Sequence, residues 1–162
     1  MIEGAVAFLA AFVVATLVEY ATHRLMHGGV LLYRWHAGHH KQGDGQGFCG
    51  EFLSYSFAIL ALGWAGFLYS VPAGIGWAAG GLVYAALAAY AHQLQHERPE
   101  LVFWMPRPVH HLHHKHHMWR HNFGILTDLW DRVFGTYKLA DWQPERRPRD
   151  YPWRAFLQIK WY

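Results

Sequence analysis

Long apolar segments alternate along this chain with short segments rich in polar residues and histidine. The longest apolar segment, residues 52–95, contains no Asp, Glu, Lys or Arg. A helix needs roughly 20 apolar residues to cross a bilayer core about 30 Å thick, so this segment is long enough for two crossings. Proline and glycine within residues 71–74 mark a turn. The pattern therefore predicts a membrane hairpin with helices over residues 52–70 and 75–95.

A further apolar segment, residues 4–18, predicts another membrane helix. The residues before it include the acidic Glu3 and no basic side chain, which argues against a cleaved secretory signal. A length of 162 residues suits one domain. We therefore expect an all-α integral membrane bundle with about three transmembrane helices and a histidine-rich helical cap, as a single domain over residues 1–162. A buried hairpin in a soluble bundle is the alternative, but soluble helices seldom lack charge on every face.

The basic residues predict the orientation of these helices. All fourteen lysines and arginines lie at Arg24 or later, and none lies in a predicted membrane segment or in the 71–74 turn. One crossing before Arg24 and two before Arg98 put every cation on the same face, which the positive-inside rule makes cytoplasmic. The histidines and the C-terminus share that face. Anionic headgroups explain the basic composition, and nucleic acid is not an expected partner because the cations alternate with acids.

Fourteen histidines cluster on both sides of the apolar hairpin. HRLMHGGVLLYRWHAGHH, residues 23–40, precedes the hairpin, whereas HQLQH and VHHLHHKHH follow at residues 92–96 and 109–117. Residues four apart on a helix share a face, so each HxxxH pair can direct two imidazoles at one ion. Neutral imidazole is a strong ligand for iron, zinc and copper. The predicted ligands are His23, His27, His36, His39, His40, His92, His96, His110, His113 and His114.

Ten donors exceed the roughly four to six that one ion takes, so two metal ions are expected. The last cluster contains two overlapping HxxHH frames, and we prefer the frame of His110, His113 and His114. The remaining histidines of this region are expected to support the ligands, replace one of them or lie at the surface: His111, His116, His117 and His121. Glu19 lies one turn before His23, where it would orient a ligand imidazole or pair with a cation such as Arg24.

The histidine motifs resemble those of the fatty acid hydroxylase and sterol desaturase superfamily of integral membrane non-haem di-iron enzymes. The resemblance runs from about Glu19 to Lys138 and is carried by HRLMH, WHAGHH, HQLQH and HHLHH. HNFGILTDLWDRVFGTYK then resembles the ending of bacterial sterol-desaturase-like members. HRLMHGG and WHAGHH also resemble bacterial β-carotene hydroxylases, which are similarly short, but the ending does not.

This resemblance implies that two iron ions, O2 and electrons oxidise a C–H bond of a lipid-like substrate, such as a sterol, a fatty acyl chain or a carotenoid. Zinc in a structure would be a substitute for iron. Both hydroxylation and desaturation stay open, and the implied location is a bacterial inner membrane. The chain contains no GxGxxG or CxxCH motif, and it is too short for a second catalytic module. A separate electron-transfer protein is therefore the expected electron source.

Two other functions are compatible with a histidine-rich membrane protein. A divalent metal transporter, or a membrane protein that only binds metal, would place ligands near the bilayer midplane. The hairpin offers no such ligand before His92. A b-type cytochrome would need facing histidines at matched depths, whereas the crowded HxxHH groups favour bare ions.

The aromatic residues of the spans and the C-terminal region carry weaker signals. Trp64, Tyr69, Trp77 and Tyr84 are expected to form interfacial belts or packing, with a substrate pocket as the alternative. Asp128 and Asp131 are expected to cap a short helix, from which Trp130, Phe134 and Tyr137 pack inward. Residues 145–162 mix cations with Trp and Tyr, which is typical of a segment lying against headgroups, with an electron-donor dock as the alternative.

Overall fold

The computed structural model describes residues 1–144 and 146–162 and is helical throughout its regular parts, with no strand among these residues. Glu145, the first residue of the predicted headgroup segment, lies outside the described residues. The α-helices are α1 (Ile2–His27), α2 (Tyr33–Gln42), α3 (Phe48–Leu62), α4 (Val71–Glu97), α5 (Val109–Lys115) and α6 (Leu129–Val133). Short 3-10 helices are η1 (Ala65–Leu68), η2 (Pro99–Leu101), η3 (Pro148–Asp150) and η4 (Trp153–Leu157).

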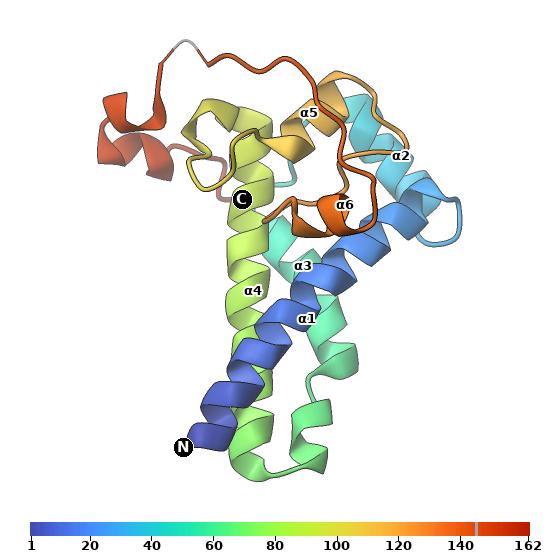
Figure 1. The fold of residues 1–162 in the computed structure, drawn as a ribbon, viewed down its shortest axis with the longest axis vertical. Coiled ribbons are helices and arrows are strands. Elements are labelled where there is room, and N and C mark those ends of the chain that lie inside the picture. Colours follow the sequence, from blue (N-terminus) through green and yellow to red (C-terminus); the bar gives the residue numbers. More distant parts are fainter. Residues whose placement is uncertain (145) are drawn as a thin grey trace.

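Two helices of the described chain, α1 and α4, are long and apolar enough to cross a membrane. They confirm the predicted spans at 4–18 and 75–95 as helices, although both continue further than predicted because the histidine-bearing ends are helical too. The prediction of one continuous helix over residues 52–70 was wrong. α3 ends at Leu62, and η1 continues the chain alongside α4 (Figure 1).

The predicted turn at residues 71–74 is the first turn of α4, so the connection lies earlier, at residues 63–70. Ser70 is the N-cap, and its hydroxyl accepts a hydrogen bond from the amide of Ala73 at 3.2 Å. Pro72 suits this position because the first helical turn does not need its missing N–H. The Ser70 hydroxyl also donates to Glu3 at 2.8 Å, which ties the start of α4 to the start of α1.

The helices α1 and α4 cross closely because glycine replaces larger side chains at their contact (Figure 1). A Cβ atom added to Gly80 would overlap the backbone carbonyl of Phe8, and one added to Gly76 would overlap that of Gly4. Close backbone approach at small residues is the usual way in which membrane helices associate. The crossing sets the angle at which α1 carries its C-terminal histidines towards α4.

The end of the molecule opposite the N-terminus holds α2, α5 and the C-terminal segment (Figure 1). Its buried core joins the end of α4 to the segments that follow it, through Leu94, Leu101, Val102, Met105, Val109, Ala155 and Ile159. The C-terminal segment is hydrogen-bonded to α3, because Phe48 and Cys49 donate their amides to the carbonyls of Lys160 and Trp161. This segment is thus part of the fold and not only a surface layer.

The predicted short helix after Asp128 is present, but neither Asp128 nor Asp131 caps it as predicted. The helix exists as α6, but Asp128 makes no capping hydrogen bond and instead pairs with Arg132 at 2.6 Å. Asp131 is fully buried and accepts hydrogen bonds from the amides of Phe123 and Gly124 at 2.9 and 2.7 Å. Phe134 stacks on Tyr20 but stays half exposed.

Candidate metal centre

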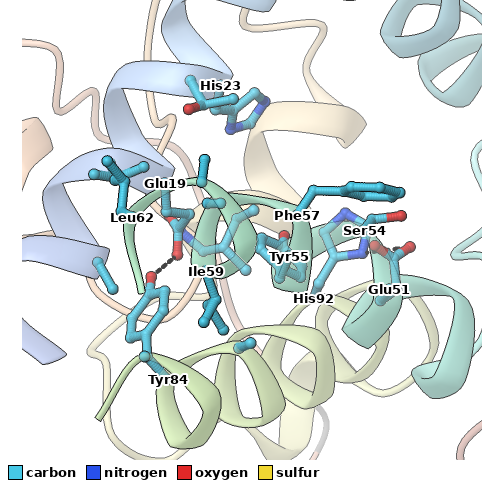
Figure 2. A pocket seen from close by; sticks show the side chains of 18 of the residues that line it. Glu19, His23, Glu51, Ser54, Tyr55, Phe57, Ile59, Leu62, Tyr84 and His92 are labelled. Atoms are coloured by element: carbon cyan, nitrogen blue, oxygen red, sulfur yellow. Dashed lines mark hydrogen bonds and ion pairs between the residues drawn. The ribbon is translucent and has the colours of Figure 1, made fainter. Parts of the chain in front are cut away.

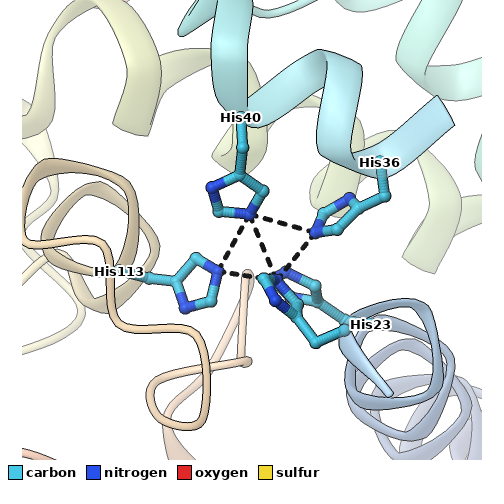
Figure 3. Close-up of side chains that lie close together, drawn as sticks. His23, His36, His40 and His113 are labelled. Carbon is cyan, nitrogen blue, oxygen red and sulfur yellow. Dashed lines mark hydrogen bonds between the residues drawn. The ribbon is translucent and has the colours of Figure 1, made fainter. Parts of the chain in front are cut away.

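Five imidazoles from three separate helices converge on one point, and we call them group A. His23 and His27 come from the end of α1, His36 and His40 from α2, and His113 from α5 (Figure 3). Their potential ligand atoms all lie within 4.8 Å of one another. The Nε2 atom of His27 lies 2.8 Å from that of His36, 2.9 Å from that of His113 and 3.1 Å from that of His40. The close Nε2 contacts distinguish this group from an ordinary cluster of surface histidines.

A second group, group B, lies directly beside the first. It consists of His39 from α2, His96 from α4, and His110 and His114 from α5. Their potential ligand atoms also lie within 4.8 Å of one another. The rings of His40 and His114, one from each group, stack with their centroids 4.0 Å apart. The structure thus brings nine of the ten predicted ligands into two neighbouring groups.

Hydrogen bonds at the outer ring nitrogens set the tautomers of several imidazoles. Nδ1 of His23 donates to the carbonyl of Phe123 at 2.5 Å, and Nδ1 of His113 donates to that of His121 at 2.7 Å. Nδ1 of His96 donates to the carbonyl of Gly43 at 3.0 Å. A neutral imidazole that carries its proton on Nδ1 has a lone pair on Nε2. These rings therefore direct lone pairs towards the centres of their groups, as metal ligands do.

Buried acceptors without hydrogen-bond partners support the same conclusion. Nε2 of His23, Nε2 of His39 and Nε2 of His114 are buried and have no hydrogen-bond partner within the described residues. An unsatisfied buried polar atom normally costs about 1–3 kcal/mol. Several such atoms facing one another would repel, unless a cation accepts their lone pairs. The donor set thus fits two cations that prefer nitrogen ligands.

The groups consist of neutral imidazoles at neutral pH. Burial, reinforced by the neighbouring imidazoles, lowers the pKa of His36 to about 2 and that of His40 to about 3. Burial also lowers the pKa of His113 to about 3 and that of His39 to about 4. Because only the neutral ring binds a metal, low pKa values keep these side chains competent as ligands.

The tenth predicted ligand, His92, lies next to group B and contacts a carboxylate that sequence reasoning missed. The ring of His92 lies 4.5 Å from that of His110 and 4.7 Å from that of His96, between centroids. Its Nδ1 lies 3.0 Å from an oxygen of the buried Glu51 on α3. The sequence position of Glu51 could have indicated its role, because it is the last charged residue before the long apolar segment.

Neither predicted role of Glu19 matches its contacts. Its carboxylate accepts hydrogen bonds from the amides of Ile125 and Leu126, at 2.9 and 3.3 Å, and from the hydroxyl of Tyr84 (Figure 2). Glu19 therefore joins α1 to α4 and to the loop before α6. That loop also carries Phe123, whose carbonyl holds His23. The side chain positions the loop rather than an imidazole.

The four histidines outside the preferred HxxHH frame lie outside both groups. The ring of His111 packs against Trp142, with the centroids 5.3 Å apart. His116 and His117 are exposed, and His121 is half-buried. Of the two frames, only that of His110, His113 and His114 contributes all its members to the groups.

A mainly apolar pocket of about 920 Å³ leads to both groups. Its walls come from α1, α3 and α4, and His23 and His92 lie among its lining residues (Figure 2). The lining also includes His36, His39 and His110. Along α1 the lining runs from Ala11 past His23, which corresponds to about 18 Å of helix. Of the aromatic residues considered above, Trp77 and Tyr84 line the pocket, whereas Trp64 and Tyr69 are largely exposed.

Comparison with known proteins identifies the family. A family model described as fatty acid hydroxylase matches residues 8–136. The match covers most of the chain, which therefore belongs to the fatty acid hydroxylase family, and it confirms the resemblance seen in the histidine motifs. Oxidoreductase activity and dependence on iron are general in this family. No curated protein and no solved structure matches the chain.

Proposed function

We propose that this member of the fatty acid hydroxylase family is a membrane di-iron oxidoreductase that uses O2 and electrons to hydroxylate or desaturate a C–H bond of a lipid-like substrate. The observation that carries the proposal is the position of groups A and B at one end of the apolar pocket. A pocket that combines an apolar wall with two metal-binding groups suits oxidation of an otherwise unreactive alkyl substrate.

The ligands of the two ions are the ten predicted histidines. Group A holds one ion, group B holds the other, and His92 completes group B with Glu51 behind it. Iron bound there supplies the activation of dioxygen, which amino-acid side chains cannot perform. Neutral ligands leave the positive charge of the ions uncompensated, so the buried Glu51 carboxylate is the nearby group that offsets it.

The pocket walls bind and orient the substrate. Small residues such as Ala15 and Ala58 leave room between α1 and α3, and the apolar lining excludes water from the reacting carbon. Hydroxylation consumes the substrate R–H, one O2, two electrons and two protons, and yields R–OH and one water. Desaturation uses the same inputs, removes two hydrogens from the substrate and releases two waters.

In the membrane, α1 and α4 are full spans, and α3 together with η1 forms a third crossing beside α4 (Figure 1). The ends of α1 and α4 that bear histidines then emerge on the same face. The distribution of lysines and arginines makes this face cytoplasmic. A substrate enters the pocket from the bilayer, because large apolar side chains such as Leu53 and Phe57 are exposed on α3.

The test compares lipid extracts of cells that express the wild-type chain, the double variant H39A/H113A or no chain, by mass spectrometry. H39A/H113A removes one ligand from each group. We expect a lipid that gains an oxygen atom or loses two hydrogens only in the wild-type cells. Purified wild-type protein should carry about two iron ions per chain. Iron-loaded protein that changes no lipid under good electron supply would contradict the proposal and favour metal binding or transport.

A further inference from the structure

The loop that follows α5 packs against two members of group A, His27 and His40, that are not among the lining residues of the pocket. This loop, residues 116–121, turns back on α5 through hydrogen bonds from the amides of His117 and Met118 to the carbonyls of His114 and His113, at 3.2 and 2.9 Å. The carbonyl of His121 accepts the Nδ1 proton of the group A member His113. The loop is therefore bonded directly to a proposed metal ligand.

Trp119 lies at the centre of this loop and connects group A to solvent. Its ring centroid lies 4.4 Å from that of His27 and 5.4 Å from that of His40, both members of group A. The indole is nevertheless 37% exposed. A single side chain thus contacts two proposed ligands with one part and the aqueous surroundings with another.

The backbone is held in an unfavourable conformation within the loop, at His117, and directly after it, at Asn122. His117 and Asn122 have φ angles of 49° and 60°, in the left-handed region that non-glycine residues seldom adopt. The side chain of Asn122 offsets part of the cost of this conformation, because its NH2 group donates to the carbonyl of Lys138 at 2.9 Å and its oxygen accepts from the amide of Lys138 at 2.8 Å. Strain of this kind persists only where the surrounding structure imposes it, and it is concentrated at functional sites.

The surface around Trp119 is a shallow basic hollow. It has a volume of about 530 Å³ and is lined by residues 116–121 and 138–141. Arg120 and Lys138 are exposed in its lining, and the exposed Lys115 precedes it. Asp141 is the one acidic residue among the lining residues. An acidic surface is the complement of this hollow.

We propose that this hollow is the docking site for a small acidic one-electron carrier protein, which delivers electrons to group A past Trp119. The inference rests on the proposed function, since each turnover needs two electrons. Each docked carrier gives up one electron and leaves oxidised, so two carriers serve one turnover, and O2 is the final electron acceptor. Transient encounters of this kind use small, charge-complementary surfaces.

Other faces of the molecule are less suited to this partner. The pocket opens between helices with exposed apolar side chains, where a water-soluble protein cannot approach. The C-terminal segment is basic, but its hydrogen bonds go to α3 and α4, through Phe48, Cys49 and Tyr90. It makes no hydrogen bond to a group A or B histidine within the described residues. The buried core at this end of the molecule would therefore separate a carrier bound there from the proposed metal ligands.

The first test measures binding of a plant-type [2Fe–2S] ferredoxin, an acidic carrier, to the detergent-solubilised metal-loaded protein. R120E/K138E reverses two charges in the hollow, and R149E/R154E reverses two exposed charges in the C-terminal segment. We expect R120E/K138E to weaken binding about tenfold and to flatten its dependence on salt, whereas R149E/R154E changes it less than about twofold. Equal effects of both variants, a larger effect of R149E/R154E, or no ferredoxin binding would each overturn the proposal.

The second test separates docking from the proposed function. Iron-loaded protein is reduced anaerobically with dithionite, freed of excess reductant and exposed to O2 once, so that no carrier protein is needed. R120E/K138E should match wild type in product from this single turnover and fall about tenfold behind it with ferredoxin as donor. An equal loss in both assays would contradict a docking role. A wild type that oxidises no lipid after chemical reduction would instead contradict the proposed function, whatever the ferredoxin binding shows.

Discussion

Glu51 and His92 face each other from α3 and α4, with a carboxylate oxygen 3.0 Å from Nδ1 of the ring. Both side chains are buried. A carboxylate behind a ligand histidine fixes the ring and strengthens its other nitrogen as a donor. The amide of Gln46 also donates to this carboxylate at 3.0 Å, which links the loop after α2 to the pair.

Glu51→Gln should lower metal affinity, because it keeps the shape of the side chain and removes the charge. Loss of such a partner typically costs about 10- to 100-fold in affinity or activity, and we expect a loss of metal affinity in this range. A chelator titration of iron-loaded protein measures the effect. Glu100→Gln, which alters a carboxylate paired with Arg98, is the matched control. Equal metal retention in wild type and Glu51→Gln would argue against this role.

Single ligand substitutions should distinguish the two groups. His113→Ala removes a member of group A, and His39→Ala removes a member of group B. Each variant should lose turnover and hold one of its two ions more weakly, because the altered group has lost a nitrogen donor whereas the other group keeps all of its imidazoles. Metal analysis of purified protein gives the stoichiometry. His111→Ala, which lies outside both groups, should keep two ions and normal turnover, and a loss in that variant would question the ligand assignment.

Ala15→Phe should block the pocket without disturbing the metals. Ala15 lines the pocket from α1, so a phenyl ring there takes up space that the substrate needs. We expect lipid product to fall at least about tenfold while iron content stays unchanged. Ala5→Phe, on an exposed position of the same helix, is the control and should have little effect. If both variants keep full activity, the substrate occupies another site.

Gly80→Ala should destabilise the protein by loosening the crossing of α1 and α4. The new Cβ would overlap the carbonyl of Phe8, and neither backbone can move without disturbing the helix. Overpacking of this kind costs about 1–3 kcal/mol. Thermal unfolding in detergent would show a lower midpoint. Gly38→Ala in α2 is a control, because a Cβ there meets nothing within 4 Å, and its midpoint should not fall.

Asp131→Ala should loosen the loop that orients His23. The carboxylate accepts hydrogen bonds from the amides of Phe123 and Gly124 and from the hydroxyl of Thr136, all buried. Leaving these donors unpaired should cost about 3 kcal/mol or more, at roughly 1–3 kcal/mol each. Asp128→Ala breaks a more exposed pair with Arg132 and should change the unfolding midpoint little. Similar midpoints for the two variants would contradict this account.

The sequence by itself determined the two longest helices and the side chains that can bind metal. Apolar length predicted α1 and α4, and the HxxxH and HxxHH spacings selected the histidines that the structure gathers. The helical repeat explains this success, because it places residues three or four apart on one face whatever surrounds the helix. The break after Leu62 escaped this reasoning, since hydropathy does not distinguish α3 from the η1 segment that continues it.

Only the tertiary structure decided how the histidines divide between the groups and which side chains support them. His36 and His40 face group A, whereas the intervening His39 faces group B, and the HxxHH frame is divided in the same way. That division depends on the crossing of α1 with α4 and on the placement of α2 and α5, which are contacts between distant parts of the chain. The same packing brings Glu19 to the amide of Ile125, 106 positions further along the chain. It also brings Glu51 to His92, 41 positions further along. Local spacing contains no information about such distant pairings, because they arise only when the helices pack.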